Sequence, residues 1–186
     1  DRQLQSLLGD VSSNLCNWLA NSGSQGPIPD SIKLPDVYPD KEGVSDAVLL
    51  RDLQLLMDGS YRPSHPGSLA HLDPPPLSAS IIGELICAGL NNNLLAEELS
   101  PSLSSLEKQL CEWFSRKLGL GPLSGGVAAS GGSLSNLMAL VIARNMAGLE
   151  SDPSAVFFAS EDSHVSLLKA IRIMGLSQDS LQKIPT

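Results

Sequence analysis

The sequence is poor in the residues that build metal centres and disulfide frameworks. It holds three cysteines and three histidines in 186 residues. Cys16, Cys87 and Cys111 form no CxxC pair and lie among apolar residues, which predicts buried thiols in a reducing cytoplasm instead of disulfides or metal ligands. The histidines, at positions 65, 71 and 164, lack the paired spacing of zinc ligands, so we expect no metal.

Positive charge and long apolar runs are also scarce. Lysine and arginine number 12 against 20 acidic residues, which gives a net charge of −8. We therefore expect neither nucleic acid nor an anionic membrane surface as a partner. No apolar stretch approaches the roughly 18 residues that a membrane-spanning helix needs, and no basic and then apolar leader opens the chain. The apolar content of 42% is still enough for one globular core.

Residues 1–76 have the pattern of a helical arm with long irregular connections. Apolar residues recur at helical spacing over 1–20, and again over 45–57 with Ser45 as the expected N-cap. Nine of the thirteen prolines fall between Pro27 and Pro76. Because proline prevents regular structure, this segment is predicted to be an arm of two helices that ends in a functional, proline-rich loop.

Residues 77–186 are predicted to form the first part of an α/β domain. A buried helix from about 77 to the asparagine triplet at 91–93 and a helix from Ser100 to Leu118 come first. The pattern then alternates. A strand at 125–130 leads into a helix that ends at about 148, a strand at 155–159 leads into a helix at 165–174, and a last strand begins at 181. This alternation predicts parallel strands in a doubly wound α/β fold.

The segment ASGGSLSN, residues 129–136, joins the first of these strands to its helix. We expect the free amides of Gly132, Ser133 and Leu134 at the helix N-terminus to favour an anion, with glycines that let a phosphate approach the backbone. The alternative is an ordinary glycine turn in which Ser133 is the N-cap. The segment is neither a Walker A loop nor a GxGxxG motif.

His164 follows the next strand, at the end where open α/β sheets bind ligands. It is a candidate for a ligand-contacting residue, and the alternative is a histidine that merely begins a helix. Because two candidate sites at successive strand ends face one crevice, each raises the value of the other.

Two stretches carry a resemblance to a known family. ASGGSLSNLMALVIAR, followed by SEDSHVSLLKAIRIMGL, resembles the pyridoxal-phosphate-dependent decarboxylases of the glutamate, aromatic-amino-acid and diaminobutyrate type. SHPGSLAHL, NNN and SPSLSSLEKQLCEWF occur in the family's order. The resemblance implies a fold-type-I, aspartate-aminotransferase-like domain preceded by a helical arm, a homodimer, pyridoxal 5'-phosphate as cofactor and a small amino acid as substrate.

The resemblance also implies roles for individual residues. Gly132 and Ser133 match the residues that hold the cofactor phosphate, and His164 matches the histidine that stacks on the pyridine ring and acts in catalysis. His71 falls in the loop that touches the substrate. The pocket-lining segment contributed by the neighbouring subunit contains Asn93 and Leu95.

The chain departs from the family in one respect. Such enzymes bind the cofactor covalently through a lysine and keep its pyridine nitrogen protonated with an aspartate, both well downstream of the stacking histidine. The six lysines, at 33, 41, 108, 117, 169 and 183, lack the expected context. We therefore expect a fragment that is not catalytic alone.

Other functions remain open from the sequence. The same cofactor fold also supports aminotransferases and carbon–sulfur lyases, although the HP loop and the NNN segment favour decarboxylation. A non-catalytic dimerisation or binding module is the alternative from another class. His71 does not select clearly among acidic, aromatic and diamino substrates, and we favour a small polar or diamino acid.

Overall fold

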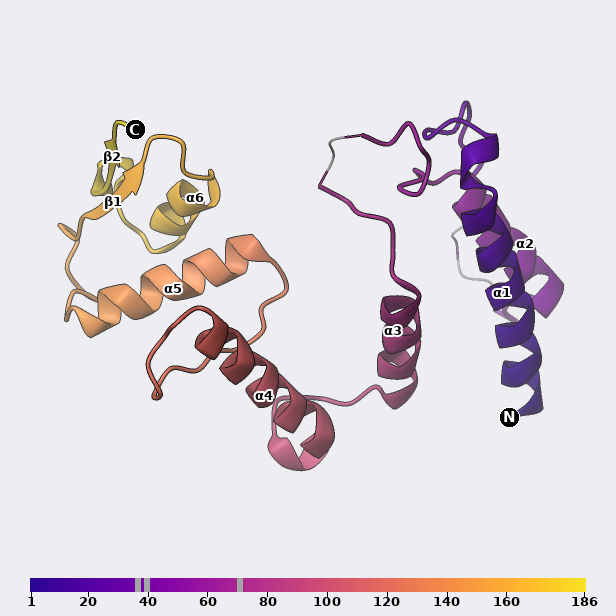
Figure 1. The fold of residues 1–186 in the computed structure, drawn as a ribbon, viewed down its shortest axis with the longest axis horizontal. Coiled ribbons are helices and arrows are strands. Elements are labelled where there is room, and N and C mark those ends of the chain that lie inside the picture. The colour runs from indigo at the N-terminus through magenta and orange to yellow at the C-terminus, as the bar shows by residue number, and fades with distance from the viewer. Residues whose placement is uncertain (36–37, 39–40, 70–71) are drawn as a thin grey trace. The chain divides into compact units, whose positions relative to one another are not determined.

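The computed structural model describes residues 1–35, 38, 41–69 and 72–186. Contacts divide the chain into two units, Asp1–Asn91 and Asn92–Thr186, which are described separately below (Figure 1). The domain boundary expected at residues 76 and 77 refers to the organisation of an intact protein and stays a prediction.

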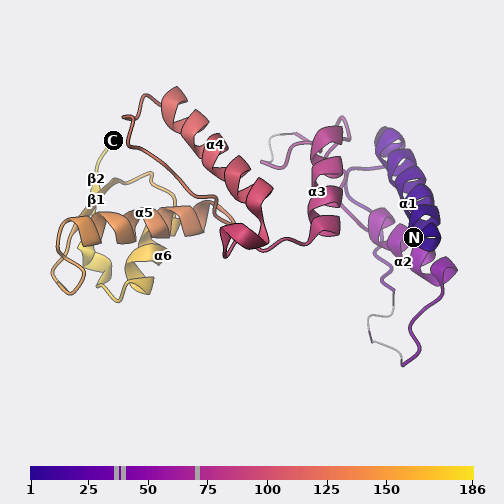
Figure 2. The same ribbon diagram turned by 90° about the horizontal axis from the view of Figure 1, so that it is seen from below.

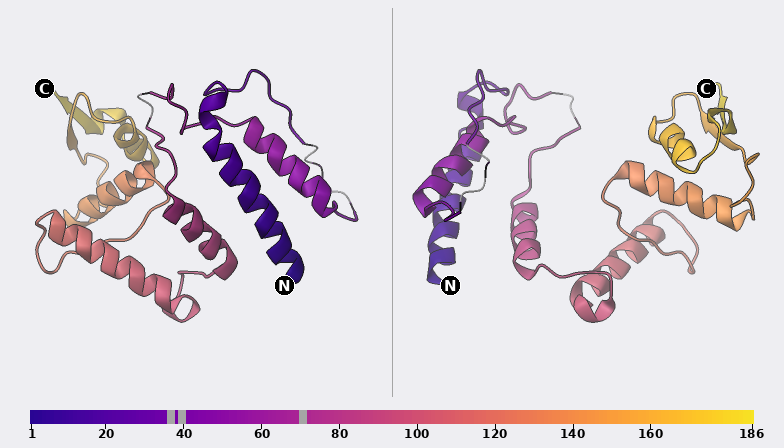
Figure 3. Two further views of the ribbon diagram at one scale, coloured as in Figure 1. Left: turned by 45° about the vertical axis from the view of Figure 1, so that its right-hand side comes forward. Right: turned by 180° about the vertical axis from the view of Figure 1, so that it is seen from behind.

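The first unit begins with two parallel helices, α1 (Arg2–Ala20) and α2 (Asp46–Asp58), joined by a long segment that contains the short 3-10 helix η1 (Ser22–Ser24). At their starts, Gln3 Nε2 donates to Asp46 Oδ1 over 3.0 Å. Ser45 caps α2 as expected, because its hydroxyl accepts the amide of Val48. The two helices lie side by side in Figures 1 and 3. Both predicted arm helices are confirmed.

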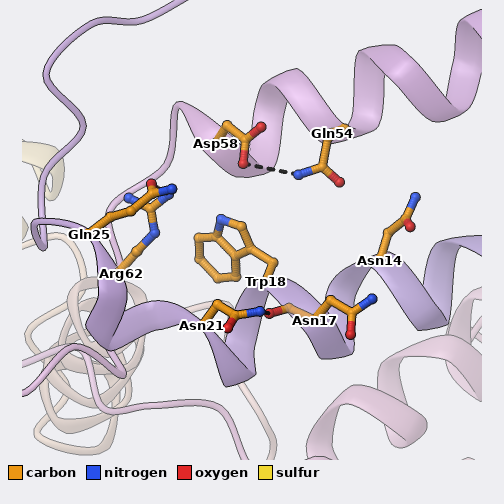
Figure 4. A pocket seen from close by; sticks show the side chains of 8 residues that line it. All are labelled: Asn14, Asn17, Trp18, Asn21, Gln25, Gln54, Asp58 and Arg62. Carbon is orange, nitrogen blue, oxygen red and sulfur yellow. Dashed lines mark hydrogen bonds between the residues drawn. The ribbon is translucent and has the colours of Figure 1, made fainter.

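A polar pocket of about 270 Å³ lies where these two helices end. Arg62, only 4% exposed, lies there with its guanidinium 5.6 Å from the ring centre of Trp18. Arg62 also donates to Gln25 Oε1 (2.7 Å) and to the carbonyl of Gly26 (3.3 Å), which fixes the proline-rich loop to the connection after α1 (Figure 4). Of the residues predicted to bind cofactor or substrate, none that the structure describes lines this pocket.

Helix α3 (Ser78–Leu90) ends at Asn91, whose φ of 45° is left-handed, as expected for the asparagine triplet. The expectation that this helix is buried is wrong for this structure. It buries no residue, and Ile82, Leu85 and Ile86 are 49–60% exposed. The helix carries apolar side chains on most of its circumference, and the first unit offers too few neighbouring residues to cover them.

The prediction of buried thiols is also wrong. Cys16 and Cys87 are exposed and Cys111 is partly exposed, all three as free thiols. The apolar neighbours that suggested burial lie on helices whose apolar faces are themselves uncovered. Among the described residues, no helix is both long and apolar enough to cross a membrane.

The second unit starts with η2 (Glu97–Leu99) and α4 (Pro101–Lys117), followed by α5 (Gly132–Met146). After these come β1 (Phe157–Ser160), α6 (Ser166–Ile173), η3 (Gln178–Ser180) and β2 (Leu181–Ile184). Figure 2 shows α4, α5 and α6 from below. Strands β1 and β2 pair in parallel, with Phe157 opposite Leu181, so the parallel α/β pattern predicted after residue 148 is confirmed.

The strand expected at 125–130 does not form, and residues 125–129 are irregular. A strand needs a neighbouring strand as a hydrogen-bond partner, and this segment has none in the described part of the chain. The amide of Ala128 instead donates to the carboxylate of Glu107 on α4, over 2.8 Å.

Helices α5 and α6 pack along each other in the same direction. Near their starts, Asn136 Nδ2 donates to the hydroxyl of Ser166 over 2.8 Å. At the other end, Arg144 of α5 donates to the carbonyls of Leu149 (2.7 Å), Asp152 (3.0 Å) and Met174 (3.3 Å). Both helix N-termini therefore lie at one edge, which β1 also approaches with its carboxyl end.

The buried core of this unit is small and lies at the Arg144 end of these helices. Ala155, Ile171 and Leu176 are buried, and Leu149, Phe157, Met174 and Leu181 pack against them. The guanidinium of Arg144 therefore supplies much of what holds the turn after α5 against the end of α6.

We predict that Arg144→Met weakens this part of the fold. Methionine keeps the stem but leaves three carbonyls without their charged donor, which is expected to cost about 2 kcal/mol. Hydrogen exchange of the α6 amides in the intact protein should then accelerate roughly 30-fold. Arg172→Met, an exposed change on α6, is the matched control and should alter exchange by less than about 0.5 kcal/mol. Equal effects of the two changes would contradict the role of Arg144.

Candidate functional site

The turn before α5 leaves two backbone amides free. Gly131 is the N-cap, and its carbonyl accepts the amides of Leu134 and Ser135, both over 3.1 Å. The expectation that the amide of Leu134 is also free is therefore wrong. The amides of Gly132 and Ser133 have no partner in the described part of the chain, and the helix dipole adds partial positive charge at this point.

Nothing in the described part of the chain explains the glycines of this turn. Gly131 has a φ of 168°, which is extended backbone that any residue adopts, and Gly132 is the first residue of the helix. A Cβ built on either residue meets no atom within 4 Å. Neither backbone conformation nor packing therefore requires glycine here, and the space in front of the free amides is open.

The alternative role of Ser133 as an N-cap does not hold. Ser133 lies inside α5, one residue after its start, and no side chain caps this helix. Ser133 is exposed, and its hydroxyl has no partner among the described residues. An exposed hydroxyl beside two free amides is an arrangement suited to an anion with several oxygen atoms.

His164 lies between β1 and α6, four residues after the end of the strand. Its Nδ1 accepts the backbone amide of Ser166 over 3.2 Å and lies 2.8 Å from the hydroxyl of Ser166. The ring thus interacts with the start of α6, which agrees with the view of His164 as a helix-start residue. Its other nitrogen, Nε2, makes none of the hydrogen bonds found among the described residues and is available to a ligand.

Hydrogen bonds join His164 to the helix that carries the glycine turn. Ser166 contacts both the imidazole and the side chain of Asn136, which lies one turn after Gly132 on α5. The two predicted sites therefore lie at the same edge of the second unit, although the structure shows no direct contact between them. Asn136 and Ser166 were not among the residues predicted from the sequence. The sequence signal that could have identified them is a polar residue near the start of each helix, on the apolar face along which α5 and α6 pack.

A small pocket of about 140 Å³ lies beside His164. Its wall includes Ser160, Ser163, Leu168 and Lys183. The Lys183 Nζ donates to the carbonyl of Glu161 over 3.4 Å, so a cation also lies at this edge. Farther away, in the turn after α5, the hydroxyl and amide of Ser154 donate to Asp152 and hold the pKa of that carboxyl below its ordinary value.

The remaining predicted residues that the structure describes, Asn93 and Leu95, are not brought to this edge. His71 lies outside the described residues. Asn93 accepts the amide of Leu95 through its Oδ1 over 2.8 Å, and Leu95 is 86% exposed. Neither of them lines the pocket beside His164. The described residues hold no group of three or more histidine, cysteine or acidic side chains arranged for a metal ion.

Comparison with known proteins identifies the family. Residues 29–186 match the model of the pyridoxal-dependent decarboxylase conserved domain. An L-2,4-diaminobutyrate decarboxylase from Acinetobacter baumannii is 29% identical over 97% of this chain and 40% of its own length. A glutamate decarboxylase-like protein from Gibberella zeae is 30% identical over 77% of this chain and 29% of its own length.

Solved structures agree on the fold. The crystal structure of mouse CSAD in apo form matches 100% of this chain and 42% of that chain, with a TM-score of 0.86 at 23% identity. The glutamate decarboxylase domain of a Vibrio parahaemolyticus protein gives a TM-score of 0.85 at 21% identity, over 98% and 44% of the two chains. The expected fold, a helical arm followed by the first part of a fold-type-I domain, is confirmed.

The chain thus spans less than half the length of each of these relatives and structures. The matched residues include the glycine turn, Asn136, His164 and Ser166. Since the family is pyridoxal-dependent, the cofactor expected from the sequence, pyridoxal 5'-phosphate, is confirmed at the level of the family. The chain belongs to the family of pyridoxal-dependent decarboxylases.

Proposed function

We propose that the intact protein removes the α-carboxylate of an L-amino acid as carbon dioxide, with pyridoxal 5'-phosphate as cofactor, in the cytoplasm. The observation that carries this proposal is the pair of free amides at the start of α5, linked through Asn136 and Ser166 to the imidazole of His164. Family membership supplies the reaction class. This chain then contributes part of the cofactor site.

The residues of the glycine turn fit the phosphate of the cofactor. A phosphate dianion accepts hydrogen bonds, and the turn offers the amides of Gly132 and Ser133 together with the Ser133 hydroxyl. The absence of any atom around a Cβ at Gly131 and Gly132 leaves room for the phosphate oxygens. A bound phosphate would thereby account for the two glycines, which nothing among the described residues explains.

His164 is proposed to lie against the pyridine ring and to handle a proton near the substrate Cα. When bound, the cofactor would supply an electron sink for the bond between Cα and the carboxylate, which is the bond that breaks when carbon dioxide is released. An imidazole is flat enough to stack and carries a nitrogen that exchanges protons near neutral pH. The interaction of Nδ1 with Ser166 leaves Nε2 for this task.

Substrate contacts are proposed for His71, Asn93 and Leu95, the last two acting in the neighbouring subunit. Leu95 is 86% exposed, which supports this proposal. An apolar side chain that no residue of its own unit buries is suited to a contact with a second chain. A diamino or small polar acid is the proposed substrate class, supported by the similarity to a diaminobutyrate decarboxylase.

The first test is an assay of the intact protein on a panel of amino acids. We predict carbon dioxide release from one of diaminobutyrate, glutamate, aspartate, cysteine sulfinate and an aromatic amino acid. Residues 1–186 alone should release none, because none of the six lysines has the context of a covalent anchor. Borohydride should therefore trap no cofactor on a lysine of this chain, and a trapped lysine would overturn the inactivity of the chain alone.

A homodimer is proposed as the working form. An apolar groove on the first unit is lined by Leu8, Val11, Leu15, Ile81 and Leu85, and Leu85 is 49% exposed. Large apolar surfaces of this kind are rare on monomers, and a second copy is the most common partner among soluble oligomers.

We predict that light scattering of the intact protein at micromolar concentration gives the mass of a dimer. Leu85→Glu should shift the mass toward the monomer, because it places a charge in the apolar groove. Glu84→Gln, the neighbouring exposed position on α3, is the control and should leave the mass unchanged. A compact monomer of the unmodified protein would count against the proposal.

A second pair of variants separates phosphate binding from proton handling. His164→Phe keeps a flat ring but loses the exchangeable proton, so we predict bound cofactor with turnover reduced about 100-fold or more. Ser133→Ala removes one phosphate hydrogen bond, so it should chiefly raise the cofactor dissociation constant, about tenfold. Turnover and cofactor dissociation are measured side by side. Wild-type turnover in His164→Phe would contradict the catalytic role and leave His164 as a residue that only begins a helix.

A further inference from the structure

Ser166 is a buried polar side chain with unusually complete hydrogen bonding. It is the first residue of α6 and only 1% exposed. Its hydroxyl contacts Asn136 Nδ2 and His164 Nδ1, each over 2.8 Å, and its backbone amide donates to the same Nδ1 over 3.2 Å. A buried hydroxyl is costly unless paired, and here each pairing also restricts the imidazole.

The direction of these hydrogen bonds follows from the donors. The amide nitrogen of Asn136 can only donate, so the hydroxyl oxygen of Ser166 accepts from it. The single proton of that hydroxyl is then free to point toward His164. The backbone amide of Ser166 can also only donate. Both groups therefore donate to Nδ1, which must be the unprotonated nitrogen, and the neutral ring carries its proton on Nε2.

We propose that Asn136 and Ser166 are positioning residues that select the Nε2–H tautomer of His164 and hold its ring. The inference rests on the proposed function, in which Nε2 of His164 faces the cofactor and substrate. A ring in the other tautomer would present a bare nitrogen at the position where a proton is needed. Asn136 and Ser166 contact neither substrate nor cofactor in this scheme and act through His164 alone.

A purely structural role makes a different prediction. If Asn136 and Ser166 only fasten α6 to α5, their replacement lowers stability and leaves the tautomer as it was. The decisive measurement is therefore the protonation pattern of the imidazole, which the packing of two helices does not set.

The sharpest variant is Asn136→Asp in the intact protein. Its carboxylate has nearly the shape of the amide but accepts where the amide donates. The Ser166 hydroxyl should then turn toward position 136, and its oxygen, 2.8 Å from Nδ1, should become the stronger acceptor because its proton is held by a carboxylate. A proton on Nδ1 that donates to this oxygen is expected to outweigh the longer, 3.2 Å contact with the Ser166 backbone amide. The major tautomer of His164 is thus expected to switch from Nε2–H to Nδ1–H. Imidazole nitrogen-15 shifts in mildly alkaline buffer report this, with the resonance assigned by its loss in His164→Phe.

Turnover and cofactor binding are measured on the same samples. Asn136→Asp should lower turnover at least about tenfold while the cofactor dissociation constant stays within about threefold, since the phosphate contacts are unchanged. Asn145→Asp places the same charge on an exposed position of α5 and should change neither. Should Asn136→Asp fail to fold, Ser166→Ala replaces it. That change leaves only the 3.2 Å backbone bond, so a mixture of tautomers is expected.

The outcomes separate this inference from the proposed function. An unchanged tautomer in folded Asn136→Asp or Ser166→Ala protein overturns the positioning role. A switched tautomer with unchanged turnover supports the hydrogen-bond assignment but overturns the role of His164 in the reaction. A switched tautomer with reduced turnover supports both.

Discussion

The guanidinium of Arg144 is the interaction on which the second unit most depends. It satisfies three carbonyls from the turn after α5 and the end of α6. The buried apolar cluster beside it, among the described residues, is small and consists of Ala155, Ile171 and Leu176. With so little apolar burial, a charged donor of fixed planar shape sets how the two helices meet. This contact joins the end of α5 to the end of α6.

The consequence appears at the opposite end of the same helix pair. Because α5 and α6 run in parallel, their N-termini and the carboxyl end of β1 come to one edge, where open α/β sheets bind ligands. Asn136 and Ser166 close the pair at this end. One end of the helix pair is thus devoted to holding the fold, and the other places free donors and an imidazole.

Local sequence signals were sufficient to predict the helix ends that carry a clear capping residue. Ser45 and Asn91 marked a helix start and a helix end because a capping hydroxyl and a left-handed backbone are local needs. The strand expected at 125–130 and the burial of α3 and the cysteines were wrong, since they depend on partners distant in the chain or outside the described residues. The amides of Gly132 and Ser133 followed from the glycine turn, whereas the link through Asn136 required the packing of α5 on α6, which no local pattern specifies.

Because the space around Gly131 and Gly132 is open, substitutions at these positions are expected to affect the abundance of the protein and its activity in opposite ways. Alanine fits both positions without a clash, and replacing a compatible glycine stabilises a fold by about 0.4–1 kcal/mol through the unfolded chain. A survey of variants by expression level would therefore favour alanine at these positions, while Arg144 would tolerate almost nothing. If the turn holds the cofactor phosphate as proposed, a survey by activity would reject the same alanines, because their methyl groups would occupy the space of the phosphate oxygens. Under the proposed function, the two glycines are positions where the chain gives up stability to keep room for the cofactor phosphate.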